Sequence, residues 1–187
     1  GLTVRLFIAI EFPPAVKQTI RDVQQAMKKR GVSGRFVGED NLHLTLQFLG
    51  EVTPLLIKSL IVVLRDAARP SSPFELSLAN IGKFGKDGSA KVVWLGLQGN
   101  VAALNQLYSR IVKATAQLGM AAEQRPYCPH VTLARDVAFF ERIYTNEAVL
   151  VPAISFEVAH FALYDSSQQQ GKRVYTVIDS FPLGGKA

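Results

Sequence analysis

The sequence has 187 residues, of which 48% are hydrophobic and 19% are charged. A chain of this length and composition can bury a full hydrophobic core, which excludes an intrinsically disordered protein. It carries 21 basic and 15 acidic residues, a net charge of +6, and this modest positive field favours anionic partners such as nucleotides or RNA.

In the first half of the chain, predicted strands alternate with predicted helices. Val4–Glu11 has the alternation of a strand, and a helix begins at the prolines that follow it and ends near Gly31. Leu42–Leu49 is predicted to be a strand, and Pro54–Ala68 a second helix. The apolar residues that recur on one face of these two helices are Val16, Ile20, Val23 and Met27, then Leu56, Leu60, Leu64 and Ala67.

The second half contains more strands, and neighbouring strands are expected to pair as hairpins. The predicted elements are strands Phe74–Ile81 and Val92–Leu97 joined by a turn over Gly82–Gly88, a helix Val101–Leu118, a short strand His130–Ala134, and strands Ile154–Tyr164 and Lys172–Ile178 around a loop Asp165–Gly171. This order predicts an α+β fold with antiparallel sheets. No long linker divides the chain, so residues 1–187 are expected to form a single two-lobed domain.

Three features of the sequence bear on where the protein works. Cys128 is the single cysteine, so no intramolecular disulfide can form, as is usual in a reducing cytosol. No apolar stretch approaches the ~20 residues of a membrane span. The start of the chain also lacks the pattern of a signal peptide. A cytoplasmic protein without membrane contact is expected.

A four-residue pattern occurs twice, as His43-Leu44-Thr45-Leu46 and as His130-Val131-Thr132-Leu133. Successive side chains of a strand point to opposite faces. Each copy therefore buries its aliphatic pair and presents an imidazole beside a hydroxyl on the other face. Two of the three histidines of the chain lie in these two copies, which chance explains poorly.

Opening a cyclic phosphodiester requires such a pair of groups. One base deprotonates water on one side of phosphorus, and one acid protonates the departing oxygen on the other side. An imidazole, with an ordinary pKa of ~6.5, performs either task near neutral pH. The threonine hydroxyls, Thr45 and Thr132, can donate hydrogen bonds to the non-bridging phosphate oxygens. His43 and His130 are therefore predicted to be an acid–base pair.

Two other interpretations of the repeated pattern stay open. Each copy is also compatible with a plain amphipathic strand, although the use of two histidines out of three argues against that. A metal site is the other alternative, but the motifs lack a neighbouring cluster of His, Cys or carboxylate ligands. No metal and no cofactor are expected.

The residues around the motifs resemble the two-histidine phosphoesterases, and within them the bacterial RNA 2′,3′-cyclic phosphodiesterases of the LigT/ThpR type, historically called 2′-5′ RNA ligases. The resemblance covers nearly the whole chain. The matching segments are Arg5–Ile10, Asn41–Val52, Val93–Gly96, Pro129–Asp136, Phe161–Tyr164 and Tyr175.

The resemblance implies a bilobal α+β fold with pseudo-twofold symmetry, in which two antiparallel sheets with flanking helices face a central groove. It also implies hydrolysis of a terminal 2′,3′-cyclic phosphate to a 2′-phosphate, without a cofactor. Carried over residue by residue, His43 is the acid and His130 is the base. The sequence alone leaves that assignment open because the two motifs are nearly symmetric. The reverse reaction, 2′-5′ RNA ligation, is allowed by the same residues.

Three residues near the motifs or in the last strands have other candidate roles. Arg135 is a candidate to bind phosphate. Phe48 is a candidate to stack on a base, but strict alternation predicts that it faces away from His43 and packs in the core. His160 lacks a threonine two residues later and is predicted to be structural.

The expected partner is RNA with a 2′,3′-cyclic phosphate end, such as a tRNA fragment, or a cyclic nucleotide, and a monomer is expected. Two competing functions remain. One is an RNA- or nucleotide-binding module with the same fold, which turnover would exclude. The other is a phosphodiesterase for another small cyclic phosphate, which a substrate panel would separate.

Overall fold

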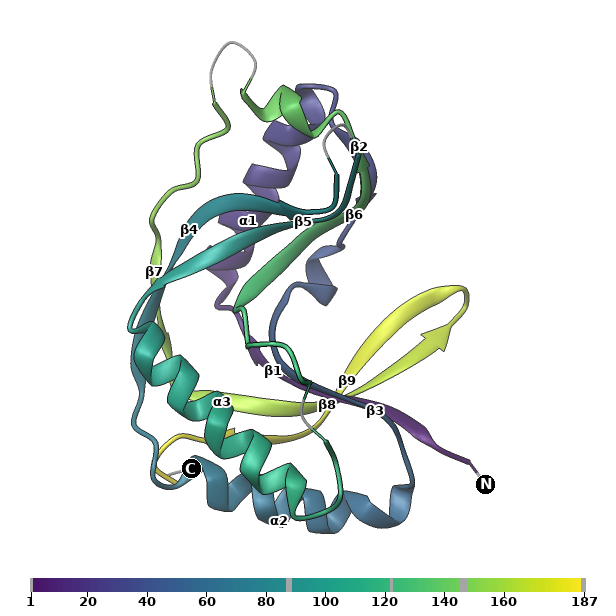
Figure 1. Ribbon diagram of the computed structural model, residues 1–187, viewed down its shortest axis with the longest axis vertical. Helices are drawn as coiled ribbons and strands as arrows, with labels where there is room; N and C mark the ends of the chain where they lie inside the picture. Colours follow the sequence, from purple (N-terminus) through teal and green to yellow (C-terminus); the bar gives the residue numbers. More distant parts are fainter. Residues whose placement is uncertain (1, 87–88, 122, 145–147, 186–187) are drawn as a thin grey trace.

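The computed structural model describes residues 2–86, 89–121, 123–144 and 148–185. They form two antiparallel sheets, each covered by helices, and Figure 1 shows the sheets as an upper and a lower lobe. No helix within these ranges is long and apolar enough to cross a membrane. The expected α+β fold with two antiparallel sheets and flanking helices is confirmed.

The lower lobe is built on a four-stranded sheet with the strand order β3-β1-β8-β9. Two helices, α2 and α3, cover its outer face (Figure 1). The elements of the lower lobe are β1 (Val4–Glu11), β3 (His43–Val52), α2 (Ile57–Ala68), α3 (Val101–Ala116), β8 (His160–Gln169) and β9 (Lys172–Pro182).

The upper lobe is built on a five-stranded sheet with the order β2-β6-β5-β4-β7, and α1 packs against it (Figure 1). Three short 3-10 helices, η1 to η3, lie between the regular elements. The remaining elements are α1 (Pro14–Lys29), β2 (Ser33–Phe36), η1 (Glu39–Asn41), η2 (Pro54–Leu56), β4 (Phe74–Phe84), β5 (Ser89–Gly99), β6 (His130–Ala138), η3 (Phe140–Tyr144) and β7 (Ser155–Val158).

The predicted apolar helix faces are the buried ones. Val16, Ile20, Val23 and Met27 of α1 are all buried. In α2 the buried stripe begins at Leu60, because Leu56 belongs to the preceding 3-10 helix and is only half-buried. Residues of both sheets contribute to one contiguous hydrophobic core.

The two halves of the chain repeat a strand–helix–strand unit, β1-α1-β3 and β5-α3-β6, in which the two strands pair antiparallel. The helices are exchanged between lobes: α1 follows a lower-lobe strand but packs on the upper sheet, and α3 follows an upper-lobe strand but packs on the lower sheet (Figure 1). This arrangement agrees with the expected pseudo-twofold symmetry.

The segment predicted as one strand, Ile154–Tyr164, is divided between the two sheets. Its first part, β7, pairs with β4 in the upper sheet, and its second part, β8, pairs with β1 and β9 in the lower sheet. The prediction of a single strand was wrong because the chain passes from one lobe to the other at Ala159, where periodicity alone gives no signal.

Several strands were predicted too short, and the strand β2 was not predicted. The predicted loop Asp165–Gly171 is mostly strand, because β9 pairs with β8 as far as Gln169. The expected turn over Gly82–Gly88 begins later, since β4 continues to Phe84, and residues 87–88 lie outside the described ones. Gly82 pairs with Trp94 within the strand, and a Cβ at Gly82 would lie 2.1 Å from the Trp94 ring, so this position requires glycine.

Candidate active site

The two motifs lie on β3 and β6 with the predicted alternation. His43 and Thr45 are half-buried on one face, while Leu44 is fully buried on the other. His130 and Thr132 are likewise half-buried on β6, beside a fully buried Leu133. Each strand therefore presents an imidazole and a hydroxyl to the space between the lobes, because the aliphatic side chains anchor it in the core.

Both motif strands contain a β-bulge at the last residue of the motif, Leu46 in β3 and Leu133 in β6. In β3, Thr45 pairs with Ala9 but Gln47 pairs with Ile8, so one extra residue enters β3. In β6, Thr132 pairs with Trp94 and Ala134 with Val93, which places an equivalent extra residue there. An extra residue reverses the alternation of faces beyond it.

The bulges change the orientation of Phe48 and Arg135. Each follows its motif histidine by five residues, so strict alternation would turn it away from that histidine. Because the bulges reverse the faces, both side chains line the same groove as the histidines. Phe48 is 62% exposed, and the prediction that it packs in the core was wrong.

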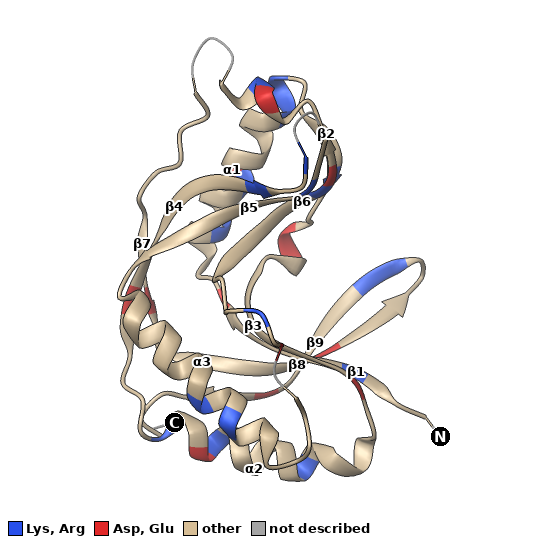
Figure 2. Ribbon diagram, in the orientation of Figure 1, with Lys and Arg blue, Asp and Glu red and all other residues tan. Residues whose placement is uncertain are grey.

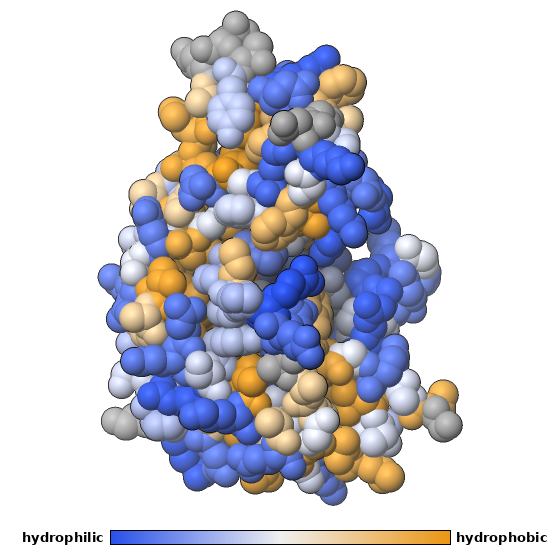
Figure 3. Space-filling model, in the orientation of Figure 1, coloured by the Kyte–Doolittle hydropathy of each residue, from blue (hydrophilic) through white to orange (hydrophobic). Residues whose placement is uncertain are grey.

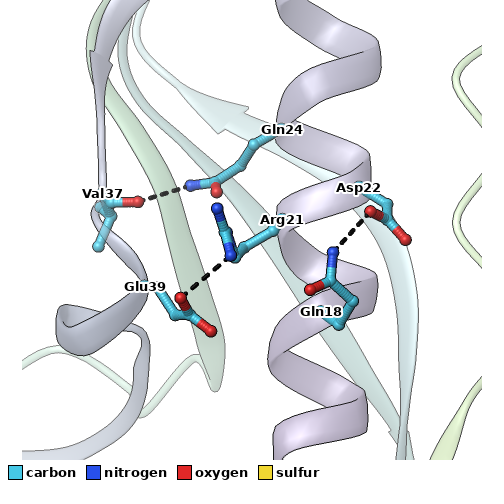
Figure 4. A network of polar contacts seen from close by, with 6 residues as sticks. All are labelled: Gln18, Arg21, Asp22, Gln24, Val37 and Glu39. Atoms are coloured by element: carbon cyan, nitrogen blue, oxygen red, sulfur yellow. Dashed lines mark hydrogen bonds and ion pairs between the residues drawn. The ribbon is translucent and has the colours of Figure 1, made fainter.

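Each bulge is contacted by a buried polar side chain from the exchanged helix. Gln24 of α1 donates from Nε2 to the carbonyl oxygens of Val37 at 2.9 Å and Leu133 at 3.0 Å, and the first bond is drawn in Figure 4. Thr115 of α3 donates to Oε1 of Gln47 at 3.0 Å. A buried polar group is costly unless it is bonded, so these contacts fix the bulges in position.

One groove of about 650 Å³ brings all six predicted residues together. His160 does not line it and lies exposed at the start of β8. Lys91 and Arg125 also line the groove, as does one acidic residue, Glu123, so that with Arg135 the cationic side chains are in excess. The predicted residues on its walls are His43, Thr45, Phe48, His130, Thr132 and Arg135.

His43 lies in an aromatic pocket of the lower sheet. Its ring meets the Tyr164 ring edge-on at 4.7 Å and lies 5.7 Å from that of Tyr175. Burial, followed by the charge of Lys17, lowers the pKa of His43, and the Asn41 backbone and Glu11 oppose this. The buried Nδ1 atom has no partner in bonding geometry among the described residues.

His130 is held differently. Its Nδ1 atom lies 2.7 Å from the carbonyl oxygen of Cys128, and its ring meets the Phe84 ring edge-on at 5.5 Å. A carbonyl oxygen only accepts hydrogen bonds, so Nδ1 carries the proton and Nε2 of the neutral ring has a free lone pair. Nε2 of His130 can therefore accept a proton.

The segment before the second motif contacts the first motif directly. The Tyr127 hydroxyl donates to the backbone oxygen of Thr45 at 3.0 Å, and its ring stacks on Tyr108 at 4.1 Å. Burial raises the pKa of Tyr127, so the hydroxyl remains a donor. This link between the motifs was not predictable, because Tyr127 and Thr45 are far apart in the sequence.

The described residues include no group of three or more His, Cys, Asp or Glu side chains arranged to hold a metal ion. Glu11, whose charge raises the pKa of His43, forms an ion pair with Lys17 at 3.5 Å. The groove offers imidazole, hydroxyl and cationic side chains for chemistry.

Comparison with known proteins identifies relatives along the whole chain. The family description of the 2′-5′ RNA ligase superfamily matches residues 12–170. An RNA 2′,3′-cyclic phosphodiesterase of Escherichia coli K12 is 34% identical over 183 residues, which are 96% of this chain and 96% of that protein. A protein of the same name from Geobacillus stearothermophilus is 33% identical over 96% of this chain, which spans only 57% of that relative's length.

Solved structures show the same fold. The crystal structure of E. coli LigT in apo form has a TM-score of 0.78 at 33% identity, covering 97% of this chain and 98% of that one. The complex of E. coli LigT with 3′-AMP has a TM-score of 0.76 at 32% identity, covering 98% and 99% of the two chains. A Thermus thermophilus protein, TT0787, has a TM-score of 0.78 at 27% identity, covering 98% and 100%.

Proposed function

We propose that this chain, which belongs to the 2′-5′ RNA ligase superfamily, is an RNA 2′,3′-cyclic phosphodiesterase that opens a terminal cyclic phosphate to a 2′-phosphate. The observation that carries the proposal is that two His-x-Thr motifs, from two different sheets, line one groove. Relatives named RNA 2′,3′-cyclic phosphodiesterase, aligned over nearly the whole chain, support the same activity.

In the proposed reaction His130 is the base and His43 is the acid. Nε2 of His130 takes a proton from water as the water oxygen bonds to phosphorus. The bond from phosphorus to the 3′ oxygen breaks, and His43 donates its proton to that oxygen. The product carries a 2′-phosphate and a free 3′ hydroxyl. His130 then returns its proton to solvent and His43 regains one, which completes the cycle.

The Thr45 and Thr132 hydroxyls are proposed to donate hydrogen bonds to the two non-bridging oxygens, where charge grows in the transition state. Arg135 supplies a fixed positive charge beside the phosphate, and Phe48 offers an exposed ring on which the terminal base stacks. The six residues and both sheets then work as one two-lobed unit.

The lowered pKa of His43 makes it a stronger acid once it is protonated. Burial keeps the free ring neutral more of the time. A bound cyclic phosphate adds a negative charge nearby, and such a charge favours the imidazolium. Substrate binding therefore favours the protonated form of His43, which donates a proton to the leaving oxygen.

We further propose a monomeric enzyme without metal or cofactor that acts in the cytosol on RNA ends such as those of tRNA fragments. The exposed free thiol of Cys128 is compatible with a reducing compartment. The same two histidines also catalyse 2′-5′ RNA ligation when RNA ends are concentrated. In that step the 5′ hydroxyl of a second RNA replaces water, gives its proton to His130 and bonds to phosphorus, while the bond to the 3′ oxygen breaks and His43 protonates that oxygen.

The proposed function is tested with an oligoribonucleotide that ends in a 2′,3′-cyclic phosphate, incubated with the protein in EDTA. We expect turnover to a product with a 2′-phosphate, identified by ³¹P NMR. Binding without turnover would assign the chain to the RNA-binding alternative. A 3′-phosphate product would contradict the assigned leaving oxygen.

A further inference from the structure

Strands β8 and β9 continue well beyond the rest of the lower sheet. β1 pairs with β8 only from Ala162 to Asp165, whereas β8 and β9 pair as far as Gln169 and Lys172. The turn residues, Gln170 and Gly171, both have positive φ, as in the type I′ turn that favours tight hairpins. Residues 166–175, here called the basic ribbon, project as a two-stranded arm (Figure 1).

The basic ribbon has a polar surface with a positive tip. Its glutamines and Lys172 are exposed and Arg173 is half-exposed, and hydrophilic residues cover this region in Figure 3. Neither Lys172 nor Arg173 forms an ion pair with an acidic side chain of the described residues, and Figure 2 shows their charge near the tip. Two strands alone bury little apolar area, so packing does not explain the length of the arm.

The ribbon is attached to the mouth of the groove. Tyr175, at its base, lines the groove and meets the Phe7 ring edge-on at 4.8 Å. Asn41, which also lines the groove, donates from Nδ2 to the backbone oxygen of Arg173 at 3.2 Å. Lys172 and Arg173 are therefore held a few residues from the wall that carries His43.

We infer that the basic ribbon binds backbone phosphates of the RNA that lie 5′ to the reacting end. The inference rests on the proposed function, since a terminal cyclic phosphate beside the histidines leaves only the 5′ side of the RNA to continue out of the groove. Lys and Arg neutralise phosphates, and the amides of Gln168 and Gln169 can donate to phosphate or ribose oxygens. These contacts favour oligonucleotides over mononucleotides, without preference for base sequence.

The test compares two double variants that each remove two positive charges. Lys172→Ala/Arg173→Ala alters the ribbon, and Lys58→Ala/Lys113→Ala alters exposed positions on α2 and α3 that do not line the groove. We expect the ribbon variant to raise the KM for an oligoribonucleotide with a cyclic phosphate end by about 5- to 50-fold, with kcat unchanged. The slope of log KM against log salt should fall by about 1.4, or ~0.7 for each lost phosphate contact.

A cyclic mononucleotide has no backbone phosphate for the ribbon to bind. Both variants should therefore hydrolyse 2′,3′-cyclic AMP with the same kinetics as the unaltered protein. An equal rise in the KM for the oligonucleotide in both variants would show an effect of net charge and overturn the inference. Weaker binding of the mononucleotide by the ribbon variant would overturn it as well, because the ribbon would then act by shaping the catalytic groove.

Equilibrium binding separates this inference from the proposed function. Fluorescence anisotropy with a 5′-labelled oligoribonucleotide that ends in a 2′-phosphate measures binding without turnover. If the unaltered protein bound this RNA but cleaved no cyclic phosphate, the proposed function would fail. A weaker Kd for the ribbon variant alone would still support the ribbon site, and an unchanged Kd would reject it.

Discussion

His43 on β3 and His130 on β6 occupy equivalent positions, each two residues before a threonine and followed by a bulge, yet their surroundings differ. His43 is enclosed by aromatic rings, with a buried Nδ1 that lacks a described partner and a lowered pKa. His130 has its Nδ1 fixed by the Cys128 carbonyl. Repetition of a motif thus places two imidazoles at equivalent positions, and their different surroundings are the basis on which we propose different roles for them.

The two bulges lie at equivalent positions, but the side chains that contact them and the residues that follow them differ. Gln24 spans two backbone carbonyls near β6, whereas Thr115 bonds to a side chain, Gln47, on β3. The residue that each bulge turns into the groove is cationic in one strand and aromatic in the other, Arg135 and Phe48. We therefore expect one wall to hold the phosphate and the other wall to hold the base.

The largest effects should come from the two motif histidines. His43→Ala and His130→Ala should each lower kcat by about 10²–10⁴-fold, because each removes a positioned acid or base. The double variant should lose less than the product of the two, since both groups act in one displacement. His160→Ala serves as the control and should keep normal rates. Loss of turnover in His160→Ala with activity kept in His130→Ala would reject the paired-motif site.

The motif threonines should matter less than the histidines. Thr45→Ala and Thr132→Ala should each lower kcat by about 10–10³-fold, because each removes one neutral donor to the phosphate. Serine keeps the hydroxyl, so Thr45→Ser and Thr132→Ser should recover most of the activity. Equal loss in the serine and alanine variants would indicate that the methyl group, and not the hydroxyl, is important.

Removing the Gln24 hydrogen bonds at the β6 bulge should lower both the free energy of unfolding and kcat. Gln24→Met leaves the Val37 carbonyl without its side-chain donor and should cost about 1–3 kcal/mol of unfolding free energy, measured in urea. Displacement of Arg135 should lower kcat by up to about 10²-fold. Gln18→Met, at an exposed position of the same helix (Figure 4), is the control. Identical behaviour of the two variants would show that Gln24 does not position β6.

The pH profile of kcat/KM should be bell-shaped, because one imidazole must be protonated and the other neutral. One limb follows the titration of His43, whose pKa is lowered by burial and by Lys17. Lys17→Gln should raise that pKa and move this limb to higher pH. Glu11→Gln removes an opposing charge and should move it to lower pH. Shifts in the same direction in both variants would contradict this assignment.

The smallest effect is expected from metal removal. Hydrolysis of a 2′,3′-cyclic phosphate should proceed at an unchanged rate after dialysis against EDTA, because the proposed acid, base and phosphate donors are all side chains of the groove. Loss of turnover in chelator, with recovery on addition of a divalent metal ion, would show that a metal ion takes part.

Local patterns predicted the helices and the motif faces well, because amphipathic periodicity is imposed by the core on each element separately. The bulges were not predictable, since Gln47-Phe48 and Ala134-Arg135 continue each strand without a sequence mark for the extra residue. Contacts across the chain, such as Tyr127 with Thr45, depend on the packing of two lobes. The exchange of helices between lobes depends on the same long-range packing.

The most direct test of the division between acid and base uses an RNA end in which sulfur replaces the 3′ bridging oxygen of the cyclic phosphate. A thiolate departs without a proton, so this substrate does not need the acid. We predict that His43→Ala cleaves it at close to the rate of the unaltered protein, while His130→Ala remains inactive. Rescue of His130→Ala, with no rescue of His43→Ala, would reverse the two roles and contradict the proposed mechanism.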